Sequence, residues 1–311
     1  MAPDSFRTPG VAVLIGSASG IGKATALAYA RNGARGLILA DFNEPGVQKT
    51  AAQAKQEATH EDFAVLTLRV DVRDYVSVEN VFEEGIKKFG RIDYSVTAAG
   101  IFVGQGFLAD NPLDLYDDVQ ETNAKGVLHH TKAAIRVMLK QEPLVIQDVD
   151  RARIIGRGAI VNICSIAGLV SVPGNIEYVA SKFAAVGITK TAGFGPTSGR
   201  IDQFMLPFLL PRTNENPGRL TLMGLPAGEY GSSQIRINAV CPGAIETPLL
   251  ERALALAPES RTAFTNGASL KRVGDVEEVA DAILFLTSNA GSFLHGSSMT
   301  VDGGYANNGP I

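Results

Sequence analysis

The stretch VAVLIGSASGIGKATALAYARNG (residues 11–33) places the strongest constraint on the fold. Its first five residues are all apolar, as in a strand buried on both faces. A glycine-rich turn follows, and the remaining residues favour a helix that closes at Gly33. This order is the first half of a βαβ unit, in which the next strand runs parallel to the first.

The same alternation of strand and helix continues to the end of the chain. Further apolar runs predict strands at 36–41, 63–72, 93–100, 158–165, 235–243 and 297–304. Helices are predicted between them: one capped by Asp74 and Gly90, a long helical region over 113–140, the helix containing YVASK (178–182), and a late helix over 275–288. We therefore predict an α/β fold, a doubly wound parallel sheet (Rossmann fold) of about seven strands with helices on both faces.

Two segments interrupt this rhythm. Residues 141–157 lengthen the link into the fifth strand. Residues 196–228 contain five prolines and no steady periodicity, and so long a connection is unusual inside a compact domain. We interpret residues 1–311 as a single domain with an insertion at about 196–228.

Composition excludes several classes of protein. A net charge of −4 leaves no overall basic surface for nucleic acid, and no apolar run is long enough to span a membrane. The N-terminus lacks the apolar core of a signal peptide. Cys164 and Cys241 both lie in apolar runs, which favours buried thiols in a reducing compartment. We expect a cytoplasmic protein, and we identify no metal site.

The turn GSASGIG indicates a site for a dinucleotide. Gly16, Gly20 and Gly22 follow the spacing G-x-x-x-G-x-G, and they stand between a predicted strand and a predicted helix. Glycines let backbone N–H groups, such as those of Ser19 and Ile21, approach a pyrophosphate, whose charge the helix N-terminus favours. Other tight strand–helix turns also need glycine. The interpretation as a dinucleotide site therefore rests on the position of the turn between a predicted strand and a predicted helix.

Asp41 ends the second predicted strand, 25 residues after Gly16. A carboxylate there accepts hydrogen bonds from an adenosine ribose and repels a 2′-phosphate, which favours NAD(H) and leaves NADP(H) possible. No Lys or Arg in the turn or in DFNE (41–44) neutralises such a phosphate. The alternative role for Asp41 is the N-cap of a helix at NEPGVQKT, and the two roles are compatible.

The pentapeptide YVASK places Tyr178 and Lys182 one helical turn apart. Side chains at i and i+4 lie on one face, with Cβ atoms roughly 5–6 Å apart. An ammonium that close favours the phenolate over the phenol, so the pair suits general acid–base chemistry. An ordinary amphipathic helix face is the alternative interpretation of this motif alone.

Taken together, these motifs resemble the short-chain dehydrogenases/reductases, in their short single-domain branch. The resemblance covers about residues 10–305 and rests on the glycine turn, TAAG (97–100), NAKG (123–126), Ser165 after a strand, YVASK and NAVCPG (238–243), in that order. It implies a Rossmann fold, a nicotinamide cofactor and a homodimer or homotetramer. The chain departs from the family pattern at Ile15, where the family usually has Thr, and at Thr97 and Ala98, where it usually has Asn.

The resemblance implies four catalytic residues. Tyr178 would exchange a proton with the substrate oxygen, Lys182 would assist the tyrosine and hold the nicotinamide ribose, and Ser165 would orient the oxygen. Asn123 would hold a water that links Lys182 to solvent. Without the resemblance, Ser165 reads equally as a strand-end turn residue and Asn123 as a helix residue that bonds locally.

The resemblance also assigns contacts to the cofactor beyond the glycine turn. Pro242, Gly243 and Thr247 would flank the nicotinamide amide. Asp71 and Val72 would lie near the adenine, although Asp71 is nearly as well explained as a strand-end cap. The remaining predicted contacts are Ala99 and Gly100 in the turn after the fourth strand, together with Tyr178 and Lys182.

Residues 166–177 and 244–257 are the expected walls of the substrate site. They contain one Arg, no Lys and several leucines, which favours a neutral, fairly apolar ketone or secondary alcohol as substrate. Plain packing explains the leucines equally well. Two other functions stay open: a nucleotide-binding sensor or scaffold without turnover, and a family member adapted to a non-redox step.

Overall fold

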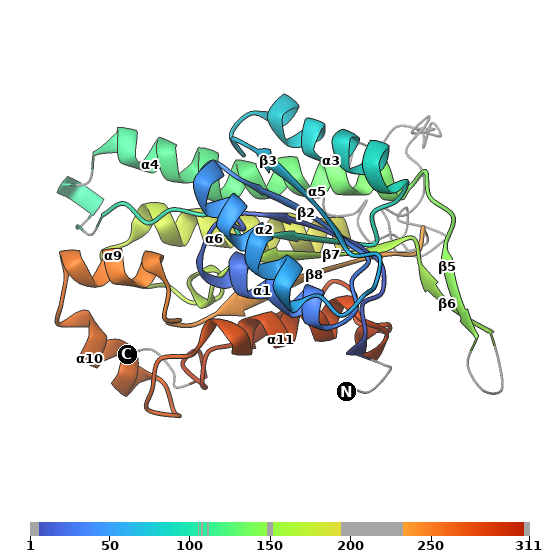
Figure 1. Cartoon of the computed structure of the whole chain (residues 1–311). Helices are drawn as coiled ribbons and strands as arrows, with labels where there is room; N and C mark the ends of the chain where they lie inside the picture. Colours follow the sequence, from blue (N-terminus) through green and yellow to red (C-terminus); the bar gives the residue numbers. More distant parts are fainter. Residues whose placement is uncertain are drawn as a thin grey trace, which may run out of the picture.

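A computed structural model of the chain describes residues 6–104, 106, 108–110, 112–147, 152–193 and 233–307. Within these ranges seven strands form one sheet in the order β3-β2-β1-β4-β7-β8-β9 (Figure 1). The strands are β1 (Val11–Ile15), β2 (Gly36–Asp41), β3 (Ala64–Arg69), β4 (Tyr94–Thr97), β7 (Gly158–Ile163), β8 (Ile235–Pro242) and β9 (Ser298–Val301). Every neighbouring pair is parallel, which confirms the predicted doubly wound sheet.

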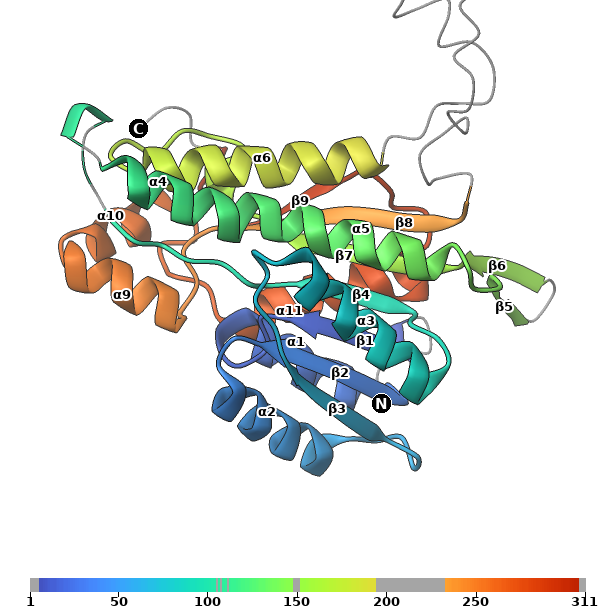
Figure 2. The same ribbon diagram turned by 90° about the horizontal axis from the view of Figure 1, so that it is seen from above.

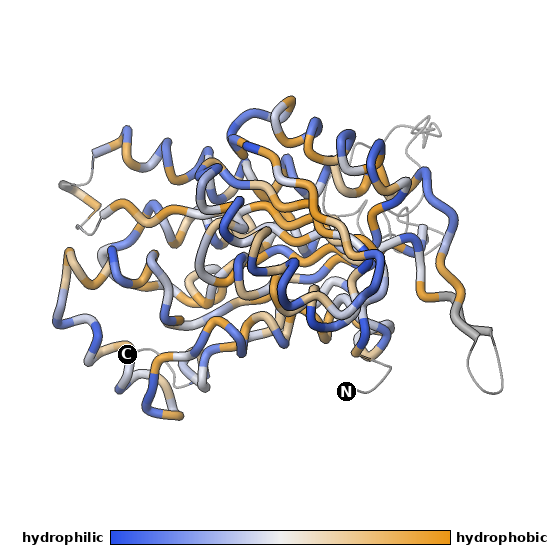
Figure 3. The backbone as a smooth tube through the Cα atoms, viewed as in Figure 1, coloured by the Kyte–Doolittle hydropathy of each residue, from blue (hydrophilic) through white to orange (hydrophobic). Residues whose placement is uncertain are grey.

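Helices cover both faces of the sheet (Figure 2). On one face lie α1 (Gly20–Arg31), α2 (Glu44–Glu57) and α11 (Val276–Thr287), whose apolar residues form one core cluster with the strands. On the other lie α3 (Tyr75–Phe89), α5 (Gly126–Met138) and α6 (Ile176–Gly193). The strands between them are the most hydrophobic part of the chain (Figure 3), because helices bury both of their faces.

The carboxyl ends of the parallel strands meet at one edge of the sheet. Beyond this edge lie α4 (Leu113–Val119), α9 (Pro248–Leu256) and α10 (Ser260–Gly267), on the left of Figure 1. Short 3-10 turns, η2 (Leu108–Asp110), η4 (Ile166–Gly168) and η5 (Asn289–Gly291), complete the connections. Ligands of doubly wound sheets bind beyond this edge, so the predicted site residues are expected there.

Two predicted elements differ in detail from the structure. The region 113–140 consists of α4, a π-helical turn η3 (Gln120–Lys125) and α5 in one continuous run. The third strand, predicted over 63–72, ends at Arg69. Its neighbour β2 stops at Asp41, whose carbonyl accepts the last sheet bond from Val70, so no strand remains to pair with Asp71.

Residues 141–157, left unassigned by the sequence, contain β5 (Leu144–Gln147) and β6 (Ala152–Gly156). These pair antiparallel and project from the amino edge of the sheet, opposite α9 and α10 (Figure 1). The insertion predicted at 196–228 lies outside the described residues. The elements that flank it meet at the same amino edge, where α6 ends and β8 begins. A Cβ placed on Gly193, the last residue of α6, would lie 3.1 Å from the Ile237 carbonyl near the start of β8.

A buried polar network joins α5 to the sheet. His130 has no exposed surface, and its Nδ1 lies 3.2 Å from Asn162 Oδ1 while its Nε2 lies 2.7 Å from Ser95 Oγ. Asn162 Nδ2 donates to the hydroxyls of Thr131 and Thr189 at 3.0 Å. Since the Asn162 oxygen can only accept, His130 donates from Nδ1 and accepts the Ser95 hydroxyl, as a neutral imidazole.

This network predicts an acid-labile contribution to stability. Burial lowers the pKa of His130 to about 3, against about 6.5 in an unfolded chain. Below pH about 6.5 the unfolded chain therefore binds a proton that the folded chain excludes, and stability falls as the pH drops towards 3, by up to about 1.4 kcal/mol per pH unit. Urea unfolding of the wild type and of His130→Gln across this range should show a shallower loss in the variant.

The half-exposed His60, in the loop after α2, provides the matched control. His60→Gln should keep the wild-type pH dependence, because it leaves the His130 network intact. Equal slopes for wild type and His130→Gln would show that the buried imidazole does not set the acid stability.

Candidate active site

Tyr178 and Lys182 lie one turn apart near the N-terminal end of α6, as predicted. The Lys182 ammonium lies 5.4 Å from the centroid of the Tyr178 ring. Phe102, in the segment after β4, packs edge to face on the same ring at 5.5 Å. Tyr178 is therefore half-buried, with an aromatic side chain and a cation on its flanks.

Lys182 is buried, with 5% of its surface exposed. Its Nζ lies 3.5 Å from the Ile163 carbonyl at the end of β7, a contact at the long limit of a hydrogen bond. Two glycines, which have no side chain, leave space for Lys182 at this buried position. A Cβ on Gly168 would meet the Lys182 carbonyl at 2.5 Å, and one on Gly100 would lie 3.6 Å from Nζ.

Two free cysteines line the strands beneath this lysine. Cys164 and Cys241 are both buried, as the sequence predicted. A hydrogen bond from Cys241 and the charge of the nearby Lys182 hold the pKa of the Cys164 thiol below its usual range, against the effect of burial. The same bond raises the pKa of Cys241, since Cys241 is its donor. Lys182 therefore contacts the Tyr178 ring on one side, and its charge lowers the pKa of the Cys164 thiol on the other.

Asn123 lies in the π-helical turn η3, and its side chain is fully buried. Oδ1 accepts from the Ile101 N–H at 2.8 Å, and Nδ2 donates to the Ile101 carbonyl at 2.9 Å. Nδ2 also lies 3.2 Å from the Ser181 hydroxyl in α6. The amide thus fastens the segment after β4 to α6, and π turns of this kind recur at functional sites.

Ser165 follows the end of β7 and begins the 3-10 turn η4. Its backbone is extended, and its Oγ accepts from the Ala167 N–H at 3.1 Å. This is the turn-capping role that the residue type alone suggested. Because η4 packs on α6 through Gly168, the capped serine also stands at the carboxyl edge beside α6.

The glycine turn after β1 leaves no room for a side chain at Gly16 or Gly22. Gly16 has φ +87, and a Cβ there would lie 2.3 Å from the Ala99 nitrogen. A Cβ on Gly22 would lie 2.0 Å from the Gly16 carbonyl. Ser19 precedes α1 without a capping bond from its side chain, so the first N–H groups of α1, from Gly20 and Ile21 onward, are open to an anion.

Asp41 is tied to this turn. Its Oδ2 accepts from the Ala18 N–H and its Oδ1 from the Asn43 N–H, both at 2.9 Å. The alternative role as N-cap of the next helix is wrong: Asn43 caps α2, through a 3.2 Å bond from the Gly46 N–H to its Oδ1. Backbone amides therefore fix the carboxylate beside the proposed pyrophosphate position.

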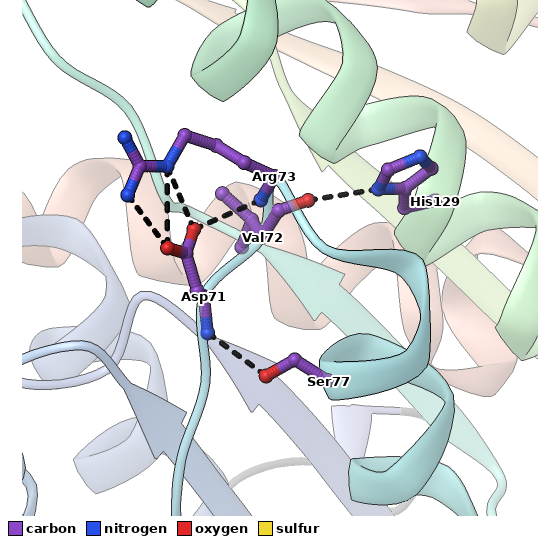
Figure 4. Close-up of polar contacts among 5 residues, drawn as sticks. All are labelled: Asp71, Val72, Arg73, Ser77 and His129. Carbon is purple, nitrogen blue, oxygen red and sulfur yellow. Dashed lines mark hydrogen bonds and ion pairs between the residues drawn. The ribbon is translucent and has the colours of Figure 1, made fainter.

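Asp71 and Val72 lie in the loop after β3 (Figure 4). The Arg73 guanidinium binds the Asp71 carboxylate in a bidentate pair, with Nη2 2.7 Å from Oδ2 and Nε 2.9 Å from Oδ1, and this bonding lowers the pKa of the carboxyl. The Val72 carbonyl accepts from His129 Nδ1 at 2.9 Å. Asp71 therefore reaches the carboxyl edge already paired, and its contact with adenine stays a prediction.

Three predicted residues approach from the end of β8. Pro242 is the last residue of β8, and the Gly243 N–H donates to the Val301 carbonyl at 3.0 Å. Thr247 caps α9, accepting from the Leu250 N–H at 3.2 Å. A Cβ on Gly20 would lie 3.3 Å from the Thr247 methyl, so the loop after β8 reaches the glycine turn.

Comparison with known proteins identifies the family. The model of the short chain dehydrogenase family matches residues 10–197, and the enoyl-(acyl carrier protein) reductase model matches 221–306. The short-chain dehydrogenase srdC of Neurospora crassa is 34% identical over 296 residues, covering 95% of this chain and 96% of srdC. The chain belongs to the short-chain dehydrogenase family. It is therefore a nicotinamide-dependent oxidoreductase that acts on CH–OH or C=O groups.

Further relatives agree with this assignment. The 3-oxoacyl-(acyl-carrier-protein) reductase of Thermotoga maritima is 32% identical over 294 residues, covering 94% of this chain and 96% of that protein. The crystal structure of levodione reductase superposes with a TM-score of 0.78 at 27% identity, over 97% of this chain and 99% of the other. The superposition with levodione reductase thus spans nearly the whole chain.

The residues of this short-chain dehydrogenase fit the nicotinamide cofactor that the family uses. A turn too tight for a Cβ at Gly16 or Gly22, an uncapped helix N-terminus and a fixed carboxylate are the features that a dinucleotide pyrophosphate and ribose require. The departures at Ile15, Thr97 and Ala98 are accommodated by packing: Ile15 and Thr97 are buried, and the Ala98 N–H donates to the Ile15 carbonyl at 2.7 Å.

Sequence reasoning missed several residues of the site. Phe102 and Ile101 follow TAAG but carry no motif of their own, and Arg73 appeared only as a charge after Asp71. Ser181 lies three residues after Tyr178 within YVASK, so helical spacing could have placed it on the same face of the helix. In the described ranges no group of three or more His, Cys, Asp or Glu residues is arranged to hold a metal ion. No described helix combines the length and apolarity needed to cross a membrane.

Proposed function

We propose that this short-chain dehydrogenase transfers hydride between a nicotinamide cofactor and a neutral, fairly apolar ketone or secondary alcohol. The observation that carries the proposal is the arrangement at the carboxyl edge. There a half-buried tyrosine, Tyr178, stands over a buried lysine, Lys182, one loop after Ser165 and across from the glycine turn. Oxo and hydroxy compounds in the names of relatives support the reaction class.

Each residue of this site has a role that its position allows. The bound cofactor supplies or accepts the hydride. Tyr178 gives its phenolic proton to the substrate oxygen in reduction and takes it back in oxidation, while the Lys182 cation stabilises the phenolate. Ser165 donates its hydroxyl hydrogen to the same oxygen and orients it. Asn123 holds Ile101 and Ser181 in place, so it acts as a positioning residue through its side chain, and the predicted water remains part of the proposal.

The preference for an apolar substrate rests on Phe102 and on the two expected walls of the substrate site, 166–177 and 244–257. Phe102 covers one side of its ring. In α9, Leu250 is buried in packing, whereas Leu249 and Leu254 are half-buried and Leu256 is 61% exposed. Glu177, the only ionisable residue of 166–177, has no exposed surface. A surface with this composition favours uncharged, largely apolar compounds.

The NAD(H) preference follows from Asp41 in this proposal. Its carboxylate is fixed where an adenosine ribose would hydrogen-bond, and its charge opposes a 2′-phosphate. Arg69 is its register partner on β3, with the guanidinium over the Phe42 ring at 4.3 Å. Arg69 is therefore the nearby cation that would favour NADP(H) once the carboxylate is neutralised.

Assembly and location complete the proposal. We expect a homodimer or homotetramer, because the outer helices α5 and α6 expose Leu128, Leu139 and Phe183 at 40–47% of their surface. Sedimentation of the purified protein checks this: a monomer at micromolar concentration would contradict it. A cytoplasmic location is supported by the two free thiols.

The insertion at about 196–228 is part of the proposal as well. The two family matches leave residues 198–220 between them, inside the proposed insertion. The flanking elements α6 and β8 meet at the amino edge, opposite Tyr178 and Ser165. Residues added at this junction therefore leave the catalytic unit on its far side.

Tyr178→Phe should abolish most turnover and leave cofactor binding intact. The ring keeps its packing against Phe102, but the proton donor is lost, and such groups contribute about 10²–10⁴-fold to the rate. Cofactor absorbance and product identity are measured on a substrate found by screening ketones and alcohols. Tyr75→Phe is the matched control, since the Tyr75 hydroxyl bonds Glu79 on α3. A Tyr178→Phe enzyme with normal kcat would refute the mechanism. Product formed without change in the cofactor would instead indicate a non-redox reaction.

Asp41→Asn should weaken NADH binding about tenfold and strengthen NADPH binding, because it removes the charge and keeps an oxygen for the Ala18 N–H. Dissociation constants for both cofactors are measured by fluorescence titration. Adding Arg69→Gln should cancel the gain for NADPH and leave NADH binding unchanged. Tighter binding of NADPH than of NADH by the wild type would contradict the role given to Asp41.

Deleting residues 196–228 and rejoining the ends should leave kcat/KM unchanged. The junction lies at the end of the sheet away from Tyr178, and the remaining residues provide a short link from α6 to β8. Activity and oligomeric state are measured together, because α6 is also the proposed subunit contact. A folded, normally assembled deletion variant without turnover would place the segment in the active site.

A further inference from the structure

A second cavity lies at the amino edge of the sheet, at the far end from Tyr178. Its volume is about 260 Å³, and its walls come from the starts of β2, β4, β7 and β8 and from the β5–β6 hairpin. In Figures 1 and 2 the hairpin marks this end of the molecule, and α9 and α10 mark the opposite one. The strands separate this cavity from the catalytic edge.

Three arginines and one carboxylate line this cavity. Arg35 precedes β2, Arg91 precedes β4, and Arg236 is the second residue of β8. Asp93 forms an ion pair with Arg91 at 2.6 Å and also accepts the Val11 N–H at 2.9 Å. Three cations therefore face one anion, and the walls carry an excess of positive charge. Burial lowers the pKa of Arg236 to about 10, so its guanidinium stays charged at neutral pH.

Two of these guanidinium groups have a nitrogen without a hydrogen-bond acceptor in the described part of the chain. Arg236 is 7% exposed, and its Nη atoms donate to carbonyls of Leu286, Thr287, Ser288 and Gly291, which closes the end of α11. Its Nε is buried and has no hydrogen-bond partner in the described part of the chain, and the same holds for Nη2 of Arg91. A buried cationic N–H without an acceptor is costly. Neither atom is open to solvent, so both groups contribute to the cavity through their charge.

The remaining walls are apolar. Leu144, Val145 and Ile155 of the hairpin line the cavity, together with the buried Tyr94 ring. Val145 is 52% exposed and marks the side open to solvent. The volume exceeds by more than tenfold the roughly 10–15 Å³ that one water needs, so a single bridging water would leave most of it unfilled.

We propose that this cavity binds a small carboxylate with an apolar tail, its head on the guanidinium groups of Arg35 and Arg91, beside the buried charge of Arg236, and its tail against Leu144, Val145 and Ile155. Planar guanidinium groups match the two oxygens of a carboxylate, and charge-assisted bonds of this kind are about twice as strong as neutral ones. The site is separate from the catalytic one, so it does not depend on the reaction proposed above.

Hexanoate is the probe, and binding to the full chain is measured by calorimetric titration with NADH saturating the active site. We expect a dissociation constant of about 1 mM or tighter, and binding at least about tenfold weaker for 1-hexanol, which lacks the charge. Arg35→Gln should weaken hexanoate binding about tenfold. Val145→Asp should abolish it, because it places a negative charge at the open side. Both positions are partly exposed, and neither is in an ion pair in the described ranges, so both variants should fold.

Arg136→Gln, which changes an arginine on the outer surface of α5, is the matched control and should bind hexanoate normally. Three results would overturn the proposal: hexanol binding as tightly as hexanoate, hexanoate binding unchanged in folded Arg35→Gln and Val145→Asp variants, or no binding by the wild type. Binding that disappears when NADH is present would place hexanoate in the catalytic site and would also reject it. None of these outcomes bears on turnover, so failure here is distinct from failure of the proposed reaction.

Discussion

The close contact between the turns after β1 and β4 is the constraint on which the site depends. Gly16 approaches the Ala99 nitrogen so closely that no side chain fits between them, and its positive φ suits only glycine well. This contact brings two backbone turns together at the point where the strand order reverses. It also sets where α1 begins, and therefore where an anion meets the N–H groups of that helix.

The position of α6 depends on a second set of close approaches. Lys182 is buried against the end of β7 because Gly168 and Gly100 leave space for α6 and for its ammonium. A buried cation needs partners, and here they are a backbone carbonyl, a thiol with a lowered pKa and the face of Tyr178. No ion pair with a carboxylate is found for this lysine in the described part of the site.

The sequence predicted those parts of the structure that local pattern determines. Continuous apolar runs located the strands, Asp74 and Gly90 bounded α3, and i,i+4 spacing put Tyr178 over Lys182. It did not predict the π turn at Gln120–Lys125, where the buried Asn123 amide bonds a segment twenty-two residues away. It also did not predict the β5–β6 hairpin, whose sequence contains no glycine at the turn. Asn43 and not Asp41 caps α2, because the Asp41 carboxylate binds the Ala18 N–H of the glycine turn. Tertiary contacts decided each of these cases.

The two ends of the sheet follow from one topological rule. Parallel strands gather residues that follow them at one edge and residues that precede them at the other. At the carboxyl edge this assembles Ser165, Asp41 and the glycine turn, each of which belongs to a recognisable motif. At the amino edge it assembles Arg35, Arg91 and Arg236, which share no motif and are far apart in the chain. A cluster of this second kind becomes visible only once the strand order is known, although it arises by the same rule as the active site.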